Sequence, residues 1–406
     1  MLYCRKDQVT EETALQEEDI SVEELIADIN ACLEKPEQPQ VYEAPAPQKK
    51  RTGLQKALTV IATFFIILME TVLLLAGALY GVMYVLAKGP SPTARNIFIR
   101  SVRETSAVGF LANLYYTEDE ILQMVGDSEA VPDYDETDSS LIHLPQPKPE
   151  EPDSNGATPD QPKTDAWGLS DEDGDGIIIE EVRGESFYGY MMVVLDPSRV
   201  IMGSDPENYG IRGYTVEQMV KKFDAVAGIN GGGFYDPDGT GNGSIPDTMV
   251  VYEGEVYYVE NGTRRGFVGF DSNHILHVGN FSPTQIKERD IQYGACFGPV
   301  LVVNGEAVDS SALGSGVNPR TAIGQRSDGA VLMLVINGRQ IGSLGATYAD
   351  LAEIFLSYGA VNACNLDGGM SSMMWYQDKY VNTGAAVFGI RPIPTAFLVL
   401  KEGDAS

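Results

Sequence analysis

Histidine is scarce in this chain of 406 residues, which contains only three. His274 and His277 lie in a segment expected to be a strand, where a spacing of three places their side chains on opposite faces. His143 lies in a distant acidic segment. The sequence also has no G-x-S-x-G, Walker A or H-E-x-x-H motif. These absences disfavour histidine-rich metal sites and Ser-His-Asp hydrolases.

Cysteine is also rare, with four residues in the whole chain. Cys4 and Cys32 lie in an acidic N-terminal segment and are expected to be reduced. Cys296 and Cys364 lie in apolar surroundings, where a buried thiol behaves as a small hydrophobic group. A disulfide between them is possible but not required by the sequence.

Basic residues are few, with 28 Lys and Arg against 58 Asp and Glu, so the formal net charge is −30. This balance argues against a nucleic-acid binder, which needs a basic face. The charge is uneven along the chain, and two acidic segments flank a basic one. The net charges are −9 over 1–48, +6 over 49–116, −18 over 117–185 and −9 over 186–406.

One long apolar run covers residues 57–87 and contains a single formal charge, Glu70. About 20 apolar residues are enough for a helix to cross a bilayer, so we predict a transmembrane helix here. The basic cluster over 49–56 favours a cytoplasmic location for the acidic tail 1–48. The sequence therefore predicts a single-pass protein of the cell membrane whose C-terminal domain is extracytoplasmic.

Two further segments separate the apolar run from the C-terminal domain. Residues 88–128 carry two helix-start signals and are predicted to form a helical stalk. Residues 129–176 hold 7 prolines and 14 acids, which is typical of a disordered, extended linker.

Two acidic segments raise the question of a calcium ion. Asp171, Asp173 and Asp175 resemble half of a calcium loop, but Val182 stands where such a loop needs its final glutamate. Asp236, with Asp238 and Asn242, offers a second oxygen-rich loop. No resident metal or other cofactor is expected, and calcium is kept as an alternative.

Residues 177–404 have the pattern of a strand-rich mixed α/β domain. Two capped helices are expected after Thr215 and Thr347, and the second leads directly into a buried strand over 360–366. Glycine-containing turn pairs within several apolar runs indicate tight hairpins. The apolar β-type runs cover 187–195, 249–259, 298–308, 330–338 and 395–400.

Three polar, glycine-containing motifs adjoin apolar strands. Adjacent glycines expose backbone amides, an arginine suits phosphate or carboxylate, and a carboxylate near hydroxyls suits acid–base or nucleophilic chemistry. Each motif alone could be an ordinary turn, but three together indicate a site. They are INGGGFYD (229–236), NPRTAIG (318–324) and NLDGGMSS (365–372).

In this order and spacing the three motifs resemble the phosphodiester glycosidase family, over about residues 180–402. The resemblance implies hydrolysis of the bond between the anomeric carbon of a sugar and a phosphodiester. Met370 departs from the family pattern, which commonly has a third glycine at this position.

The chemistry of such a reaction suggests a role for each motif. Because phosphate is a good leaving group, the essential parts are a carboxylate near the anomeric carbon and a cation on the phosphate. We expect Asp367 to be the carboxylate, Arg320 to bind phosphate, and Asn230 to bind phosphate or sugar hydroxyls. The expected substrate-binding residues are Gly231, Gly232, Gly233, Asp236, Thr321, Gly368, Gly369, Ser371 and Ser372.

The expected function is therefore that of a membrane-anchored hydrolase acting on sugar-1-phosphodiesters of envelope or exopolysaccharide glycans. Its expected partners are a phosphoglycan or sugar-1-phosphodiester substrate and the membrane, but no nucleic acid. The alternative is a non-catalytic protein that binds envelope polysaccharide through the same glycine loops. Turnover of a substrate, as opposed to binding without turnover, separates the two.

Overall fold

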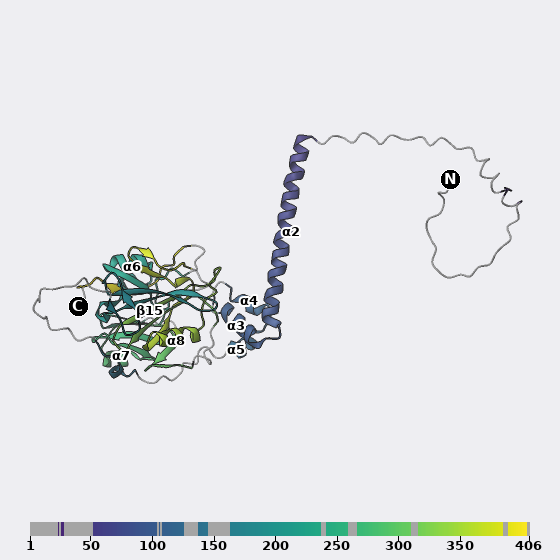
Figure 1. The fold of residues 1–406 in the computed structure, drawn as a ribbon. Helices are drawn as coiled ribbons and strands as arrows, with labels where there is room; N and C mark the ends of the chain where they lie inside the picture. Colours follow the sequence, from purple (N-terminus) through teal and green to yellow (C-terminus); the bar gives the residue numbers. More distant parts are fainter. Residues whose placement is uncertain are drawn as a thin grey trace, which may run out of the picture. The chain divides into compact units, whose positions relative to one another are not determined.

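Figure 1 shows a computed structural model of the chain, in which the long N-terminal helix α2 precedes a strand-rich domain. Nearly all of the N-terminal tail 1–48 lies outside the described residues. The structure describes Glu23, Ile26, Ala27, 52–103, Thr105, 108–125, 137–144, 163–236, 241–258, 266–309, 316–384 and 389–403.

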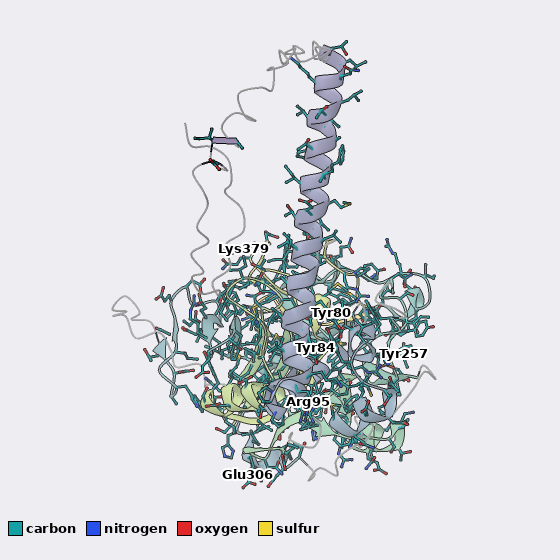
Figure 2. The ribbon with its side chains drawn as sticks, turned by 90° about the vertical axis from the view of Figure 1, so that its right-hand side faces the viewer. Tyr80, Tyr84, Arg95, Tyr257, Glu306 and Lys379 are labelled. Carbon is teal, nitrogen blue, oxygen red and sulfur yellow. The ribbon has the colours of Figure 1, made fainter. Side chains whose placement is uncertain are left out.

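Helix α2 (Gly53–Lys88) covers the predicted apolar run, and its 36 residues are long and apolar enough to cross a membrane. Its side chains point outward along its whole length, and Figure 2 shows Tyr80 and Tyr84 on its C-terminal half. Large apolar side chains such as Leu74 remain exposed. An exposed apolar surface of this kind is suited to lipid rather than to water.

The predicted helical stalk consists of three short helices that share a small core. They are α3 (Pro92–Arg103), α4 (Phe110–Asn113) and α5 (Glu118–Val125). The core residues are Ile99, Val102, Ala112 and Ile121, one or two from each helix.

Parts of the segment predicted to be a disordered linker are folded against the domain. Residues 139–141 form the 3-10 helix η1, after which Ile142 is buried and the amide of His143 donates to the carbonyl of Ser327. Further on, the Trp167 ring stacks on the guanidinium of Arg326 at 4.0 Å. The acidic, proline-rich composition predicted disorder, but two isolated apolar residues, Ile142 and Trp167, pack onto the domain.

The domain predicted over 177–404 contains three larger antiparallel sheets, so the predicted strand-rich mixed α/β class is confirmed. The first sheet has the order β13-β12-β16-β14-β15-β4-β3, the second β18-β17-β6-β19-β5 and the third β10-β9-β11-β7-β8. A two-stranded ribbon of β1 (Lys163–Thr164) and β2 (Ser170–Asp171) precedes them.

The strands of the first sheet are β3 (Ile177–Arg183), β4 (Tyr188–Val194), β12 (Val300–Val303), β13 (Glu306–Ala307), β14 (Arg320–Arg326), β15 (Val331–Ile336) and β16 (Ala360–Leu366). Those of the second are β5 (Val200–Ser204), β6 (Ala225–Asn230), β17 (Met374–Tyr376), β18 (Lys379–Tyr380) and β19 (Thr395–Leu400). Those of the third are β7 (Met249–Tyr252), β8 (Glu255–Tyr258), β9 (Phe267–Asp271), β10 (Leu276–Gly279) and β11 (Ile291–Cys296).

All three sheets contribute to one central core, which includes Met192, Phe270 and Phe397 from different sheets. Each sheet also has a helix on another face. Helix α8 (Tyr348–Ser357) packs on the first sheet, α6 (Val216–Lys222) on the second and α7 (Pro283–Glu288) on the third.

The predicted helix starts and two of the hairpins are confirmed. Thr215 and Thr347 cap α6 and α8, each in a complete capping box. The pairs Glu253-Gly254 and Asn304-Gly305 form the β7–β8 and β12–β13 turns. The pair Asn337-Gly338 does not form a hairpin, since β15 pairs only with β14 and β4.

Asp165 anchors the Trp167 turn by pairing with Arg326, whose side chain is fully buried. Burial raises the pKa of the Asp165 carboxyl, but hydrogen bonds from the amide of Leu169 and from Arg326 outweigh it and hold the pKa below its usual value. A carboxyl with a depressed folded-state pKa stabilises the fold above the unfolded-state pKa, and this stabilisation is lost as the pH falls through the folded-state pKa.

We therefore expect Asp165→Asn to lower the free energy of unfolding at pH 7 by about 1.5–3 kcal/mol. The deficit should shrink as the pH falls below the unfolded-state pKa of about 3.9. Urea unfolding over a pH series measures both effects. The exposed Asp378→Asn serves as the control, and an equal loss in the two variants would show that the Trp167 turn does not stabilise the domain.

Candidate functional site

The antiparallel order of the first sheet brings two predicted motifs together. Strand β14 lies between β15 and β16, so its first residues are opposite the last residues of both neighbours. Arg320 pairs with Ile336 and Thr321 with Leu366. Asp367, directly after β16, therefore lies beside the start of the NPRTAIG strand.

The side chain of Asn230, at the end of β6, joins the third motif to the other two. Its Nδ2 donates to the carbonyl oxygen of Asp367 (2.6 Å). Its Oδ1 accepts from the Thr321 hydroxyl (2.8 Å) and from the Met373 amide (3.1 Å). Asn230 is fully buried, so the carboxamide predicted to hold phosphate or sugar hydroxyls instead holds the protein together.

The three glycine amides predicted to face a ligand also have protein partners. Gly231 donates to the carbonyl of Thr395, Gly232 to its hydroxyl and Gly233 to the carbonyl of Cys296. A Cβ at Gly232 would lie 2.7 Å from that of Ala295. These glycines are required by the close approach of two sheets, so their predicted ligand contacts find no support in this structure.

Arg320 is buried rather than presented to solvent. Its Nε donates to the carbonyl of Ala346 (3.1 Å) and its Nη2 to that of Gly316 (2.8 Å). Its guanidinium also stacks on Tyr348, 4.3 Å from the ring centroid. In this position Arg320 ties the loop before β14 to the loop after β15.

The loop after Asp367 folds over the start of β14. The amide of Gly369, whose φ is +64°, donates to the carbonyl of Pro319 (2.9 Å). Residues 369–371 form the 3-10 helix η5. Asp367, Gly368 and Gly369 are partly exposed. The predicted catalytic carboxylate is thus at the accessible edge of the converging motifs.

The two serines of this loop are more buried than the aspartate. Ser371 and Ser372 are 3% and 2% exposed. The hydroxyl of Ser372 has no hydrogen-bond partner among the described residues. A buried hydroxyl without a partner is unfavourable in the free protein, and it is a group that a bound ligand could satisfy.

Asp236, one of the expected substrate-binding residues, is already paired. Arg391 contacts both of its oxygens, at 2.8 and 2.6 Å, and the amide of Gly241 donates to Oδ1. Asp236 therefore fixes a loop and does not stand ready as a base. The calcium loop suggested with Asp238 cannot be compared, because Asp238 lies outside the described residues.

Sequence reasoning missed Arg339, an exposed arginine next to the Asp367 loop. A Cβ on Gly369 would lie 3.5 Å from its Nη1. Its Nη2 donates to the hydroxyl of Thr105 (2.7 Å) and to Oδ1 of Asn318 (2.9 Å). Its φ of +56°, rare outside glycine, marks a constrained position. The neighbouring Asn337-Gly338 pair predicted a hairpin turn, so Arg339 was not recognised as a residue next to the Asp367 loop.

Asn337 and Asn382 extend the polar surroundings of this loop. Asn337 follows β15, is 1% exposed and has an Nδ2 group without a partner among the described residues. Asn382 donates to the carbonyl of Ser372 (2.9 Å). The antiparallel register places Asn337 and Asp367 at the same end of the sheet, on either side of the start of β14.

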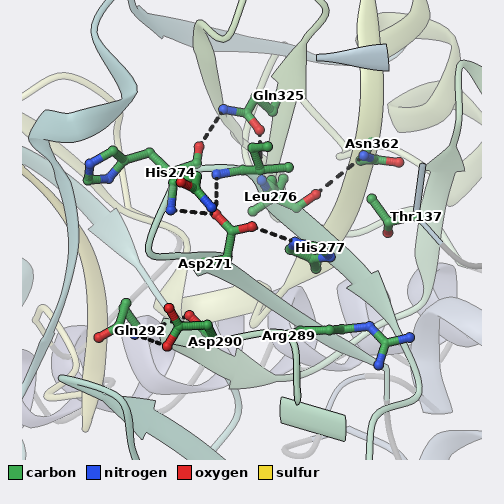
Figure 3. Close-up of polar contacts among 12 residues, drawn as sticks. Thr137, Asp271, His274, Leu276, His277, Arg289, Asp290, Gln292, Gln325 and Asn362 are labelled. Atoms are coloured by element: carbon green, nitrogen blue, oxygen red, sulfur yellow. Dashed lines mark hydrogen bonds and ion pairs between the residues drawn. The ribbon is translucent and has the colours of Figure 1, made fainter. Parts of the chain in front are cut away.

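The two histidines of the domain belong to a different, structural network (Figure 3). His274 lies in a turn with a φ of +61° and not in the predicted strand, while His277 lies in β10. His277 Nε2 lies 3.0 Å from Oδ2 of Asp271. Gln325 bonds to the carbonyl of His274 and the amide of Leu276, which ties this hairpin to β14.

Both cysteines of the domain are buried, and neither forms a disulfide within the described residues. Burial raises the pKa of the Cys364 thiol, so it is not a nucleophile near neutral pH. This agrees with the expectation that Cys296 and Cys364 act as small hydrophobic residues.

The acidic group Asp171, Asp173 and Asp175 has oxygens within 4.8 Å of one another. Asp171 accepts from the amides of Gly174 and Gly176, and Asp175 accepts from the Tyr376 hydroxyl and the Ile177 amide. These bonds account for the turn without a metal ion.

Comparison with known proteins agrees with the convergence of the motifs. Residues 223–400 match the model of the phosphodiester glycosidase family, and all three motifs fall within this region. Residues 223–400, which are less than half of the chain, thus match the phosphodiester glycosidase family.

Individual relatives are more distant. A stretch of 65 residues is 48% identical to the SPbeta prophage-derived uncharacterized protein YomE of Bacillus subtilis (strain 168), covering 16% of this chain and 10% of that protein. The chain therefore spans about a tenth of the length of this curated relative.

Two solved structures share part of the fold. One is the zebrafish N-acetylglucosamine-1-phosphodiester alpha-N-acetylglucosaminidase catalytic domain, auto-inhibited by its pro-peptide (TM-score 0.47, 19% identity, 55% of this chain and 82% of that one). The other is a hypothetical protein from Synechocystis (TM-score 0.40, 14% identity, 55% and 61%). At this similarity neither informs the chemistry of the site.

The geometry predicts that Asn230→Ala destabilises the domain. The change leaves the Asp367 carbonyl, the Thr321 hydroxyl and the Met373 amide without their partner, at about 1–3 kcal/mol for each buried group. Urea unfolding should show a loss of several kcal/mol, while Asn208→Ala, which removes a partly exposed amide, should cost far less. If Asn230→Ala leaves the free energy of unfolding unchanged, Asn230 acts only in ligand binding.

Proposed function

We propose that this protein hydrolyses the bond between the anomeric carbon of a sugar and a phosphodiester. The observation that carries the proposal is the convergence of the three motifs through Asn230, which holds the Asp367 loop beside the starts of β14 and β17. The family of residues 223–400 supports the same reaction class. A binding protein would not need a carboxylate at this position.

In the proposed reaction Asp367 acts at the anomeric carbon, as a base toward water or as a nucleophile. The bond from the anomeric carbon to the phosphate oxygen breaks, the sugar gains the hydroxyl of water, and a phosphomonoester leaves. Phosphate departs without needing a strong general acid. Ser371 and Ser372 lie in the same loop as Asp367, and the buried Ser372 hydroxyl has no partner among the described residues.

We assign the phosphate contact to Arg339 and a supporting role to Arg320. Arg339 is exposed and lies over Gly369, whereas Arg320 is 5% exposed and bonded to main-chain carbonyls. A guanidinium offers a planar fork that matches phosphate oxygens. Arg320 supports the loops on either side of the β14–β15 strand pair through these bonds.

The proposed location is the extracytoplasmic side of a membrane, with α2 as the single span. The basic residues before α2 support a cytoplasmic N-terminus. The proposed substrates are phosphoglycans or other sugar-1-phosphodiesters of the envelope or of exopolysaccharide.

Asp367→Asn should reduce turnover by about 10²–10⁴-fold, because the amide can neither accept a proton nor attack carbon. The full-length protein is incubated with a panel of sugar-1-phosphate methyl esters, and free sugar is measured. Asp378→Asn, an exposed aspartate at a φ of +61°, is the matched control. Full turnover in Asp367→Asn would contradict the mechanism, and binding without turnover in the wild type would favour the binding protein.

Arg339→Gln should raise KM for the same esters by about tenfold or more, since a charge-assisted contact with phosphate contributes about 1.5–3 kcal/mol. Its unfolding free energy should change little, because the side chain is exposed. Arg320→Gln should instead lower stability. An unchanged KM in Arg339→Gln would indicate that Arg320, and not Arg339, contacts the phosphate.

A further inference from the structure

The C-terminal part of α2 indicates where a bilayer surface would meet the chain. Counted from Ala57, just after Lys56, about 20 apolar residues cross the hydrocarbon core by about Gly77. Tyr80 and Tyr84 follow, and tyrosines are enriched at the membrane–water interface. These two rings therefore lie at the level of the lipid headgroups.

The stalk is packed against this same part of α2. The Tyr115 ring lies 6.1 Å from that of Tyr80 and 6.5 Å from that of Tyr84. The hydroxyl of Tyr116 donates to the carbonyl of Ala87 (2.6 Å), and Lys88 stacks on the Tyr116 ring. The end of α4 is consequently held at the interface and not away from it.

The stalk also reaches the candidate site. The Ser101 hydroxyl accepts from the amide of Val317 (2.8 Å). A Cβ on Gly316 would lie 2.2 Å from the amide nitrogen of Ser101, so α3 lies directly against this loop. Thr105 accepts from Arg339. A continuous series of contacts thus joins the membrane end of α2 to the arginine at the site.

Apolar side chains are exposed in the two segments that meet at the Thr105–Arg339 contact. Ile341 and Leu344, in the loop after Arg339, are 103% and 63% exposed. Phe110 and Leu114, in and after α4, are 63% and 58% exposed. Exposed apolar groups beside an interfacial helix are suited to insertion among lipid headgroups.

We propose that the site acts on sugar-1-phosphodiesters whose second ester is a membrane lipid. This inference rests on the proposed hydrolase function and adds the class of leaving group. The bond between the anomeric carbon and oxygen is hydrolysed, the free sugar enters the water, and the lipid phosphomonoester stays in the bilayer. The Arg339 loop sits at the lipid surface, with Ile341 and Leu344 against the acyl chain near the phosphate.

Charge alone would not bring this domain to a bilayer. Residues 117–185 and 186–406 are both strongly acidic, and biological membranes commonly carry anionic lipids. The span and the stalk contacts are therefore what keeps the site at the lipid surface. Hydrolysis of a water-soluble glycan does not require a site that is held at the lipid surface.

The test uses the full-length protein in vesicles of zwitterionic lipid. Two substrates share the sugar and the phosphate and differ only in the alcohol: a methyl ester, which is soluble, and a polyprenyl ester, which is embedded in the vesicle. Each sugar of the methyl-ester panel is offered with both alcohols. The variants are Ile341→Ser combined with Leu344→Ser, and the control Ile211→Ser, a comparably exposed apolar residue in the β5–α6 loop.

We expect the wild type and Ile211→Ser to cleave the polyprenyl ester at least tenfold faster than the methyl ester. The double variant should lose most of this preference and keep its methyl-ester activity. Equal rates on the two esters, or a preference that survives in the double variant, would overturn the lipid-substrate proposal while leaving the hydrolase intact. Cleavage of neither ester by folded protein would overturn the hydrolase function itself.

Discussion

The carboxamide of Asn230 is the interaction on which the arrangement of the site depends. It comes from the second sheet, and it binds the carbonyl of Asp367 and the hydroxyl of Thr321 from the first sheet. An amide is suited to this position because one side chain offers both donors and an acceptor, so buried polar groups on two sheets are satisfied together. The role proposed for Asp367 depends on the hydrogen bond from Asn230, because that bond fixes the direction of the Asp367 loop.

Much of the fold followed from local patterns in the sequence. Capping boxes marked the starts of α6 and α8, and two glycine-containing pairs marked the turns after β7 and β12, because these signals act within a few residues. The strand order could not be predicted in this way. It depends on contacts between residues far apart in the chain, such as Thr321 with Leu366.

The same distinction explains what was predicted of the site. The three motifs were found because glycine, arginine and aspartate stood out beside apolar strands, and the structure does bring them together. The roles of Asn230 and Arg320 could not be predicted, because burial and hydrogen-bond partners decide whether a polar side chain faces a ligand or the protein. Arg339 was missed because its importance comes from folding over Gly369, a contact with no local signal.

The docking of residues 137–144 has a consequence for proteolytic cleavage of the chain. Asp138 donates its amide to the side chain of Asn304, Thr137 bonds to Val278, and Ile142 is buried. After a protease cuts the chain between 144 and 163, residues 137–144 would remain covalently joined to the stalk. They would also remain bound to the domain through these non-covalent contacts. Cleavage there does not by itself release the domain, since the two fragments remain joined by non-covalent contacts.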